Sequence, residues 1–350
     1  MAPVSRARRG SMMPAARAVL AALLLAAPLA AGRAEPAPSP PRIKTIAVHA
    51  RTLDAFKPGD PSQRRFGLLE FRGGLVLTSP HRGFGGLSAI RVDAKGEGFL
   101  ALSDHGDWFT GRIAYAGQQP VGLTDVKTAP MLGADGAPLA AKGWFDTESL
   151  ALDGAIAYVG IERVNQIVRF DFAQGGIGSR GSPIKVPPAV SRLPFNKGLE
   201  ALVFVPPGLP LAGTLIAISE RGLDGAGNIL GFLIGGPAPG EFSVRRNGGY
   251  DVSDATLLPG GDLLLLERRL SLMSGGGIRI RRVRLDSVRP GAVIDGGILF
   301  EADLGYEIDN MEGISAHVSP QGETVLTLIS DDNFSMIQRT LLLQFTLAEP

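Results

Sequence analysis

The sequence predicts an all-β protein, a β-propeller with five evident blades, or six if residues 43–80 form a divergent blade. Three observations predict this fold. After residue 42 no segment shows sustained helical periodicity, whereas short apolar runs bounded by Gly, Pro, Asp and Asn are frequent. The 350 residues include 47 glycines and 26 prolines, a composition that favours turns over long helices. A pattern of two strands also recurs at about 56 residues, a period typical of propeller blades.

Each repeat contains an apolar strand, a turn with Gly, a second apolar strand and a final acidic residue. The five strand pairs are 86–92 with 98–104, 148–152 with 155–162, 200–205 with 214–220, 254–258 with 262–267, and 312–316 with 324–331. Runs such as 166–171 and 277–285 would supply the outer strands. We expect the last run, 341–347, to pair with the strand in residues 66–78 and close the ring, which leaves no long exposed sheet edge. A parallel β-helix or a β-sandwich is the alternative, although β-helix rungs are usually shorter than about 50 residues.

The N-terminus has the pattern of a secretory signal peptide. Residues 1–34 contain five arginines, four of which precede the apolar run 18–31, and a small-residue cleavage site follows near Ala34. The pair Arg8-Arg9 leaves twin-arginine export open beside the general secretory route, and an uncleaved anchor is a further alternative. The Pro-rich residues 35–42 indicate an extended linker before a propeller domain over 43–350. We therefore expect a periplasmic or secreted protein with no stable membrane span.

The charge balance excludes one class of partner. The chain has 35 basic and 34 acidic side chains, and without residues 1–34 it has 30 and 34, a net charge of −4. This balance argues against a nucleic-acid partner. The absence of cysteine excludes disulfides, thiolate metal sites and a cysteine nucleophile. We expect a monomer that binds a small anionic ester substrate or ligand.

The repeats should bring acidic residues to one face of the propeller. In an antiparallel pair, the start of one strand lies beside the end of the next. The leading acids should therefore surround the central channel, with the trailing acids behind or beside them. The leading acids are Glu148, Glu200, Asp254 and Glu312, and the trailing acids are Asp104, Glu162, Glu220, Glu267 and Asp331.

Crowded carboxylates need neutralisation, and two kinds are available. A hard cation such as Ca²⁺ takes six to eight oxygen ligands, which acids and asparagines such as Asn196 and Asn310 could supply. Alternatively, arginines that follow the trailing acids could form ion pairs between blades and an anion-binding rim together with Lys197; they are Arg163, Arg221 and Arg268. The acids could also cap strand ends or tie adjacent blades together.

Several common catalytic motifs are absent. The sequence has no Gly-x-Ser-x-Gly elbow, no Walker A motif and no His-Glu-x-x-His motif. None of the four histidines has zinc-site spacing. His105, in Asp104-His105-Gly106-Asp107, is the best candidate for an imidazole acid or base, and an exposed loop histidine is the alternative.

These motifs resemble those of the phytase-like family, named for the esterase-like activity of phytase. The resemblance rests on Gly85-Gly-Leu-Ser-Ala with Leu102-Ser-Asp-His-Gly-Asp107, Asp146-Thr-Glu-Ser-Leu150, Asn196-Lys-Gly-Leu-Glu-Ala-Leu202, and Asp309-Asn-Met-Glu-Gly-Ile314 with Ile329-Ser-Asp-Asp-Asn-Phe334. It implies an exported bacterial β-propeller and a calcium-dependent hydrolase of phosphate or other esters. The sequence departs from the family's usual Glu-Gly-Leu at Glu148-Ser-Leu, Glu200-Ala-Leu and Asp254-Ala-Thr.

Two functions follow as hypotheses. In the first, an exported hydrolase of phosphate or other anionic esters uses Glu148, Glu200, Glu312, Asp331 and His105 for catalysis. Its anionic substrate would bind to Lys197, Arg163, Arg221, Arg268 and Asn196, and its cation to Asp104, Glu220, Asp254, Glu267 and Asn310. In the second, the same face of a non-catalytic propeller binds a ligand or serves as a scaffold. The second gains if every channel acid is paired with Arg or Lys.

Overall fold

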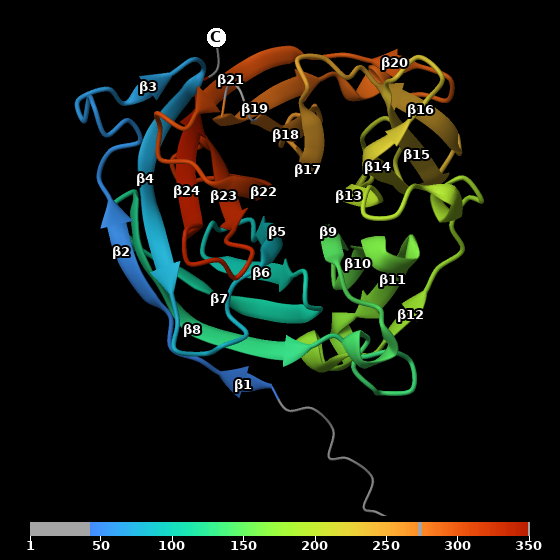
Figure 1. The fold of residues 1–350 in the computed structure, drawn as a ribbon, viewed down its shortest axis with the longest axis horizontal. Coiled ribbons are helices and arrows are strands. Elements are labelled where there is room, and N and C mark those ends of the chain that lie inside the picture. The colour runs from blue at the N-terminus through green and yellow to red at the C-terminus, as the bar shows by residue number, and fades with distance from the viewer. Residues whose placement is uncertain (1–42, 272–274, 349–350) are drawn as a thin grey trace, which may run out of the picture. The chain divides into compact units, whose positions relative to one another are not determined.

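The computed structural model describes residues 43–271 and 275–348. Five sheets are arranged around a common centre in a propeller, as predicted (Figure 1). The helices of this described part are 3-10 turns of three residues each, and none is long and apolar enough to cross a membrane. The expected signal peptide and linker, residues 1–42, lie outside the described residues.

The strands follow the chain from blade to blade. Blade one contains β5 (Leu87–Val92), β6 (Gly98–Ser103), β7 (Asp107–Ala116) and β8 (Gln119–Pro130), with β1 (Lys44–Thr45) beside β8. Blade two contains β9 (Thr147–Asp153), β10 (Ile156–Ile161), β11 (Gln166–Asp171) and β12 (Gly181–Pro183). Blade three contains β13 (Leu199–Phe204), β14 (Thr214–Leu223), β15 (Ile229–Gly235) and β16 (Gly240–Val244), to which β20 (Val293–Ile294) adds in parallel.

The last two blades complete the ring. Blade four contains β17 (Asp251–Leu257), β18 (Leu263–Ser271), β19 (Gly275–Val283) and β21 (Gly297–Asp303). Blade five contains β22 (Asn310–Val318), β23 (Thr324–Asp331), β24 (Thr340–Leu347), β4 (Leu69–Thr78) and β2 (His49–Leu53), with β3 (Arg65–Phe66) beside β4.

The ring closes between strands from opposite ends of the chain. β24 pairs antiparallel with β4, with Thr340 opposite Leu77 and Leu347 opposite Leu69, as the sequence predicted. Residues 43–80 therefore complete blade five, and β1 extends blade one, so they do not form a sixth blade. Phe56, which is fully buried between β2 and β3, packs against Phe71, Phe300 and Phe345 of blades five and four. Burying such a side chain contributes roughly 2–3 kcal/mol, so this contact reinforces the closure.

Each innermost strand carries one β-bulge at the same place. In β13, for example, Leu199 lies opposite Ser219 and Ala201 lies opposite Ile218, so Glu200 is the extra residue. A bulge interrupts the alternation of a strand and redirects a side chain. The equivalent bulge residues of the five blades are Ser88, Glu148, Glu200, Ser253 and Glu312. On the second strands, the equivalent residues beside the bulges are Asp104, Glu162, Glu220, Arg268 and Asp331.

Candidate functional site

The bulges and the ends of the second strands surround a polar cavity of about 200 Å³. Its lining comes from all five blades and contains no apolar side chain. The lining residues are Asp104, Asp146, Glu148, Glu162, Asn196, Lys197, Glu200, Glu220, Arg268, Glu312, Asp331 and Asn333. Eight of them are acidic and two are basic, so the fully ionised cavity would have a net charge of −6.

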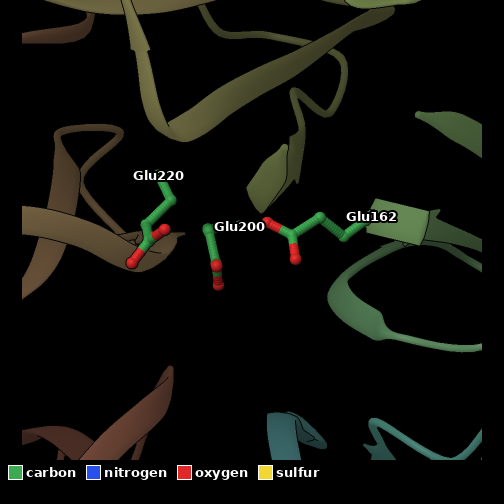
Figure 2. A group of neighbouring side chains, drawn as sticks. All are labelled: Glu162, Glu200 and Glu220. Carbon is green, nitrogen blue, oxygen red and sulfur yellow. The ribbon is translucent and has the colours of Figure 1, made fainter. Parts of the chain in front are cut away.

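Three of these acids lie close enough together to hold one cation. Glu162, Glu200 and Glu220 each offer a carboxylate oxygen, and these oxygens lie within 4.8 Å of one another. All three side chains are buried, and Figure 2 shows Glu200 between Glu162 and Glu220. They come from the first turn after β10, the bulge of β13 and the strand β14. Adjacent blades thus bring three carboxylates to one point.

Both basic residues of the cavity already contact carboxylates. Lys197 Nζ lies 2.5 Å from Glu220 Oε2. Arg268 forms an ion pair with Glu312, and its Nη2 lies 3.5 Å from Glu220 Oε1 and 4.0 Å from Glu200 Oε1. Neither of these two basic side chains is therefore free to bind an anionic substrate.

The remaining acids are not paired with Lys or Arg in the described residues. Five acids line the cavity without such a partner: Asp104, Asp146, Glu148, Glu162 and Asp331. Glu162 Oε1 nevertheless accepts a hydrogen bond of 2.6 Å from the Gly198 amide. Two buried carboxylate oxygens, Asp104 Oδ1 and Glu312 Oε2, accept no hydrogen bond from the described part of the chain. Some acids of the cavity are therefore not paired with a Lys or Arg that the structure describes. Complete pairing was the observation that would have favoured a non-catalytic propeller.

Burial in a cluster of like charges disfavours ionisation of these acids. Burial raises the pKa of Asp331 to about 6, of Asp104 and Glu162 to about 7, and of Glu312 to about 8. It also raises the pKa values of Glu148 and Glu200 well above the usual range, and neighbouring carboxylates add to the effect. A bound cation would favour the ionised forms. The donor set consists of oxygen atoms, which fits a hard divalent cation such as Ca²⁺.

Asp254, an expected metal ligand, lies outside this cavity. It follows the bulge residue Ser253, and a shift of one residue turns a strand side chain to the other face. Asp254 is fully buried and accepts hydrogen bonds of 2.7 and 2.9 Å from Arg91. Arg91 also donates to the carbonyl oxygens of Leu202 and Ile314, so it links the innermost strands of four blades. Asp254 therefore belongs to a structural ion pair at the propeller axis.

Glu267, also an expected metal ligand, is displaced for the same reason. It lies one residue before the position equivalent to Asp104 and Glu162, which Arg268 occupies in blade four. Glu267 is fully buried and accepts hydrogen bonds of 2.5 Å from Arg279 and of 2.6 and 2.7 Å from Arg281. Blade four thus contributes an arginine to the cavity where the other blades contribute acids.

Other predicted residues lie around the cavity. The His105 ring is stacked on Phe334, and its Nε2 lies 4.0 Å from Asp104 Oδ1. Asn310 donates a hydrogen bond of 2.9 Å to Glu312 and accepts one of 2.6 Å from Arg268. The Arg163 guanidinium lies over the rings of Phe145 and Phe195. Arg221 is paired with Asp251.

Three lining residues were given no role in the predicted site: Asp146, Glu162 and Asn333. Asp146 and Asn333 lie in loops and have positive φ angles of 62° and 47°. Asp146 precedes Glu148, and Asn333 follows Asp331, so sequence proximity to the predicted acids was their signal. Glu162 was expected behind or beside the leading acids, and the structure places it in the group of three.

One family model matches most of the chain. The family model described as "Phytase-like: Esterase-like activity of phytase" matches residues 82–334. No curated protein matches the chain.

Three of the solved structures that match this chain have low sequence identity to it. The Cps50 (Swd1) β-propeller domain of Myceliophteria thermophila is 11% identical, with a TM-score of 0.34, and the match covers 72% of this chain and 67% of that one. YCF48 bound to D1 peptide is 12% identical, with a TM-score of 0.34 and coverage of 70% and 62%. The PQQ-bound aldose sugar dehydrogenase of Streptomyces coelicolor is 11% identical, with a TM-score of 0.38 and coverage of 78% and 98%.

Proposed function

The chain belongs to the phytase-like family, and from this premise and the acidic cavity we propose that it is a hydrolase of phosphate or other anionic esters that requires a divalent cation, with Ca²⁺ as the first candidate. One observation carries the proposal: eight carboxylates share a cavity with only two basic side chains, both of which contact acids. An acidic cavity of this kind would repel an anionic ester unless a cation were bound there.

Glu162, Glu200 and Glu220 would hold the cation. A divalent cation bound there would neutralise charge and polarise an ester oxygen. Asn196, which also lines the cavity, could donate a hydrogen bond to the substrate. Arg268 would orient Glu312 and Glu220 through its ion pairs.

Asp104 is the best candidate for a general base. Its Oδ1 atom is buried without a hydrogen-bond donor among the described residues, and burial raises its pKa to about 7, near the optimum for proton transfer at neutral pH. It would accept the proton of an attacking water molecule. His105, whose Nε2 lies 4.0 Å away, is close enough to exchange that proton with solvent after a small movement.

We further propose that this activity operates in the periplasm or outside the cell, which the N-terminal pattern of residues 1–34 supports. Calcium sites of extracellular modules often have weak affinity. The test measures turnover of p-nitrophenyl phosphate and p-nitrophenyl acetate with Ca²⁺ and with chelator. We expect turnover that chelator abolishes and Ca²⁺ restores. Asp104→Asn should lower kcat about 100-fold or more, and the exposed Asp286→Asn should leave it unchanged. Calcium binding without turnover of either ester would instead favour the non-catalytic ligand-binding propeller.

A further inference from the structure

Aromatic side chains adjoin, in sequence, several of the residues that line the acidic cavity. The rings of His105 and Phe334 are stacked, with centroids 4.2 Å apart and an angle of 8° between their planes. The Arg163 guanidinium lies 4.9 Å from the centroid of Phe145 and 4.7 Å from that of Phe195. Each of these five residues is the immediate sequence neighbour of a residue that lines the cavity. We name them the aromatic rim.

The backbone holds Phe334 in the rim. Asn333 and Phe334 both adopt the left-handed region, at φ 47° and 48°, which a bulky side chain rarely does. Gly86 makes room for the ring, because a Cβ atom there would lie 2.5 Å from Phe334 and 2.3 Å from Asp104 Oδ1. The contacts of one glycine thus couple the rim to a carboxylate of the cavity.

Near blades three and four the cavity is bordered by charged groups instead of aromatic rings. Arg221, which follows Glu220, and Arg246 both form ion pairs with the buried Asp251. Because the cavity lining is entirely polar, an apolar part of a ligand would find partners at the aromatic rim rather than inside. Phe195, which is 66% exposed, offers the largest free aromatic surface there.

Resting on the hydrolase function above, we propose that the aromatic rim makes this site specific for aryl esters. The anionic group enters the acidic cavity with the cation, and the flat ring of the leaving group packs on Phe195. Aromatic contacts are sensitive to geometry and favour offset stacking or edge-to-face packing. A compact aliphatic ester would bind to the cavity alone.

The test compares phenylphosphonate with methylphosphonate by calorimetry in the presence of Ca²⁺, because neither probe contains an ester that could be hydrolysed. We expect phenylphosphonate to bind about five-fold or more tightly than methylphosphonate. Phe195→Ala should remove most of this preference, and Phe195→Tyr should retain it. Ile298→Ala, which removes an exposed apolar side chain from the outer strand of blade four, is the matched control. It should leave the affinities for both phosphonates unchanged.

Equal affinities for the two probes, the binding of neither, or a preference that survives in Phe195→Ala would overturn the inference. The outcome is separable from that of the proposed hydrolase. A Phe195-dependent preference without turnover of any ester would refute the hydrolase and support aromatic selectivity. Turnover with equal affinities would support the hydrolase and refute the selectivity.

Discussion

Chelation of divalent cations should destabilise the protein strongly at pH 8 and little at pH 5. Asp331 shows the origin of the effect, because burial raises its pKa from 3.8 to about 6. Ionising this carboxyl therefore costs about 3 kcal/mol more in the folded protein than in the unfolded chain. A group with a raised pKa stabilises the fold below the unfolded value, and this stabilisation is lost as the pH rises through the folded value. For Asp331 the loss falls between about pH 4 and pH 6.

The other cavity acids extend the pH range over which stability is lost. Burial raises the pKa of Asp104 to about 7 and of Glu312 to about 8, so the cation-free protein should lose stability up to about pH 8. A cation at 100 times its dissociation constant adds about 2.7 kcal/mol. At about 2–4 °C per kcal/mol, Ca²⁺ should raise the Tm by about 5–10 °C at pH 8. At pH 5 protons compete for the same oxygens, and the increase should be much smaller.

Scanning calorimetry at both pH values, with chelator and with Ca²⁺, measures this difference. Glu200→Gln tests the direction of the effect, since it removes from the group of three a carboxyl group whose ionisation is disfavoured by burial. The variant should be more stable than the native protein in chelator at pH 8 and should respond less to Ca²⁺. Asp286→Asn, which changes an exposed acid, should alter neither quantity. A Ca²⁺ effect of equal size at pH 5 and pH 8 would refute the reasoning.

Two further substitutions test the surroundings of the cavity. Arg91→Met leaves the fully buried Asp254 without its cation, and we expect a loss of about 3–5 kcal/mol in urea unfolding, whereas a loss below about 1 kcal/mol would contradict the axial ion pair. Gly86→Ala places a Cβ atom against Asp104 and Phe334 at a positive φ of 58°, so it should displace the candidate general base and lower kcat for p-nitrophenyl phosphate. Gly260→Ala, where no atom lies within 4 Å of the added Cβ, is the control; equal kcat values in the two variants would be inconsistent with the packing described.

The architecture could be predicted from the sequence because blades repeat. The period, the paired apolar strands and the expected partnership of 341–347 with 66–78 define five blades and their closure, and the structure confirms each. The short strand β20 was not predicted. It leaves the connection between β19 and β21 of blade four to pair with β16 of blade three. A strand of two residues is too short for its sequence to show a strand pattern, so this pairing between two blades could not be predicted.

The composition of the cavity could be predicted only in part, because one blade has an ambiguous register. In blade four the sequence offers Ser253 beside Asp254, and Glu267 beside Arg268. If the repeats are aligned by their acidic residues, Asp254 and Glu267 take the cavity positions. The bulge instead places Ser253 and Arg268 at these positions. Hydrogen bonding between strands decides the register, and residue type alone does not. A shift of one residue was enough to exchange a site residue for a buried structural one.

Ring closure also determines when during folding the cavity can exist. The chain is made from its N-terminus, but β4 has to wait for β24 before blade five is complete. The carboxylates of the cavity extend from Asp104 to Asp331, so no partial chain contains them all in place. Pairing such distant segments is a slow step in folding. A cation that binds the assembled cavity therefore cannot guide the early steps of folding. It would instead stabilise the ring after the ring has closed.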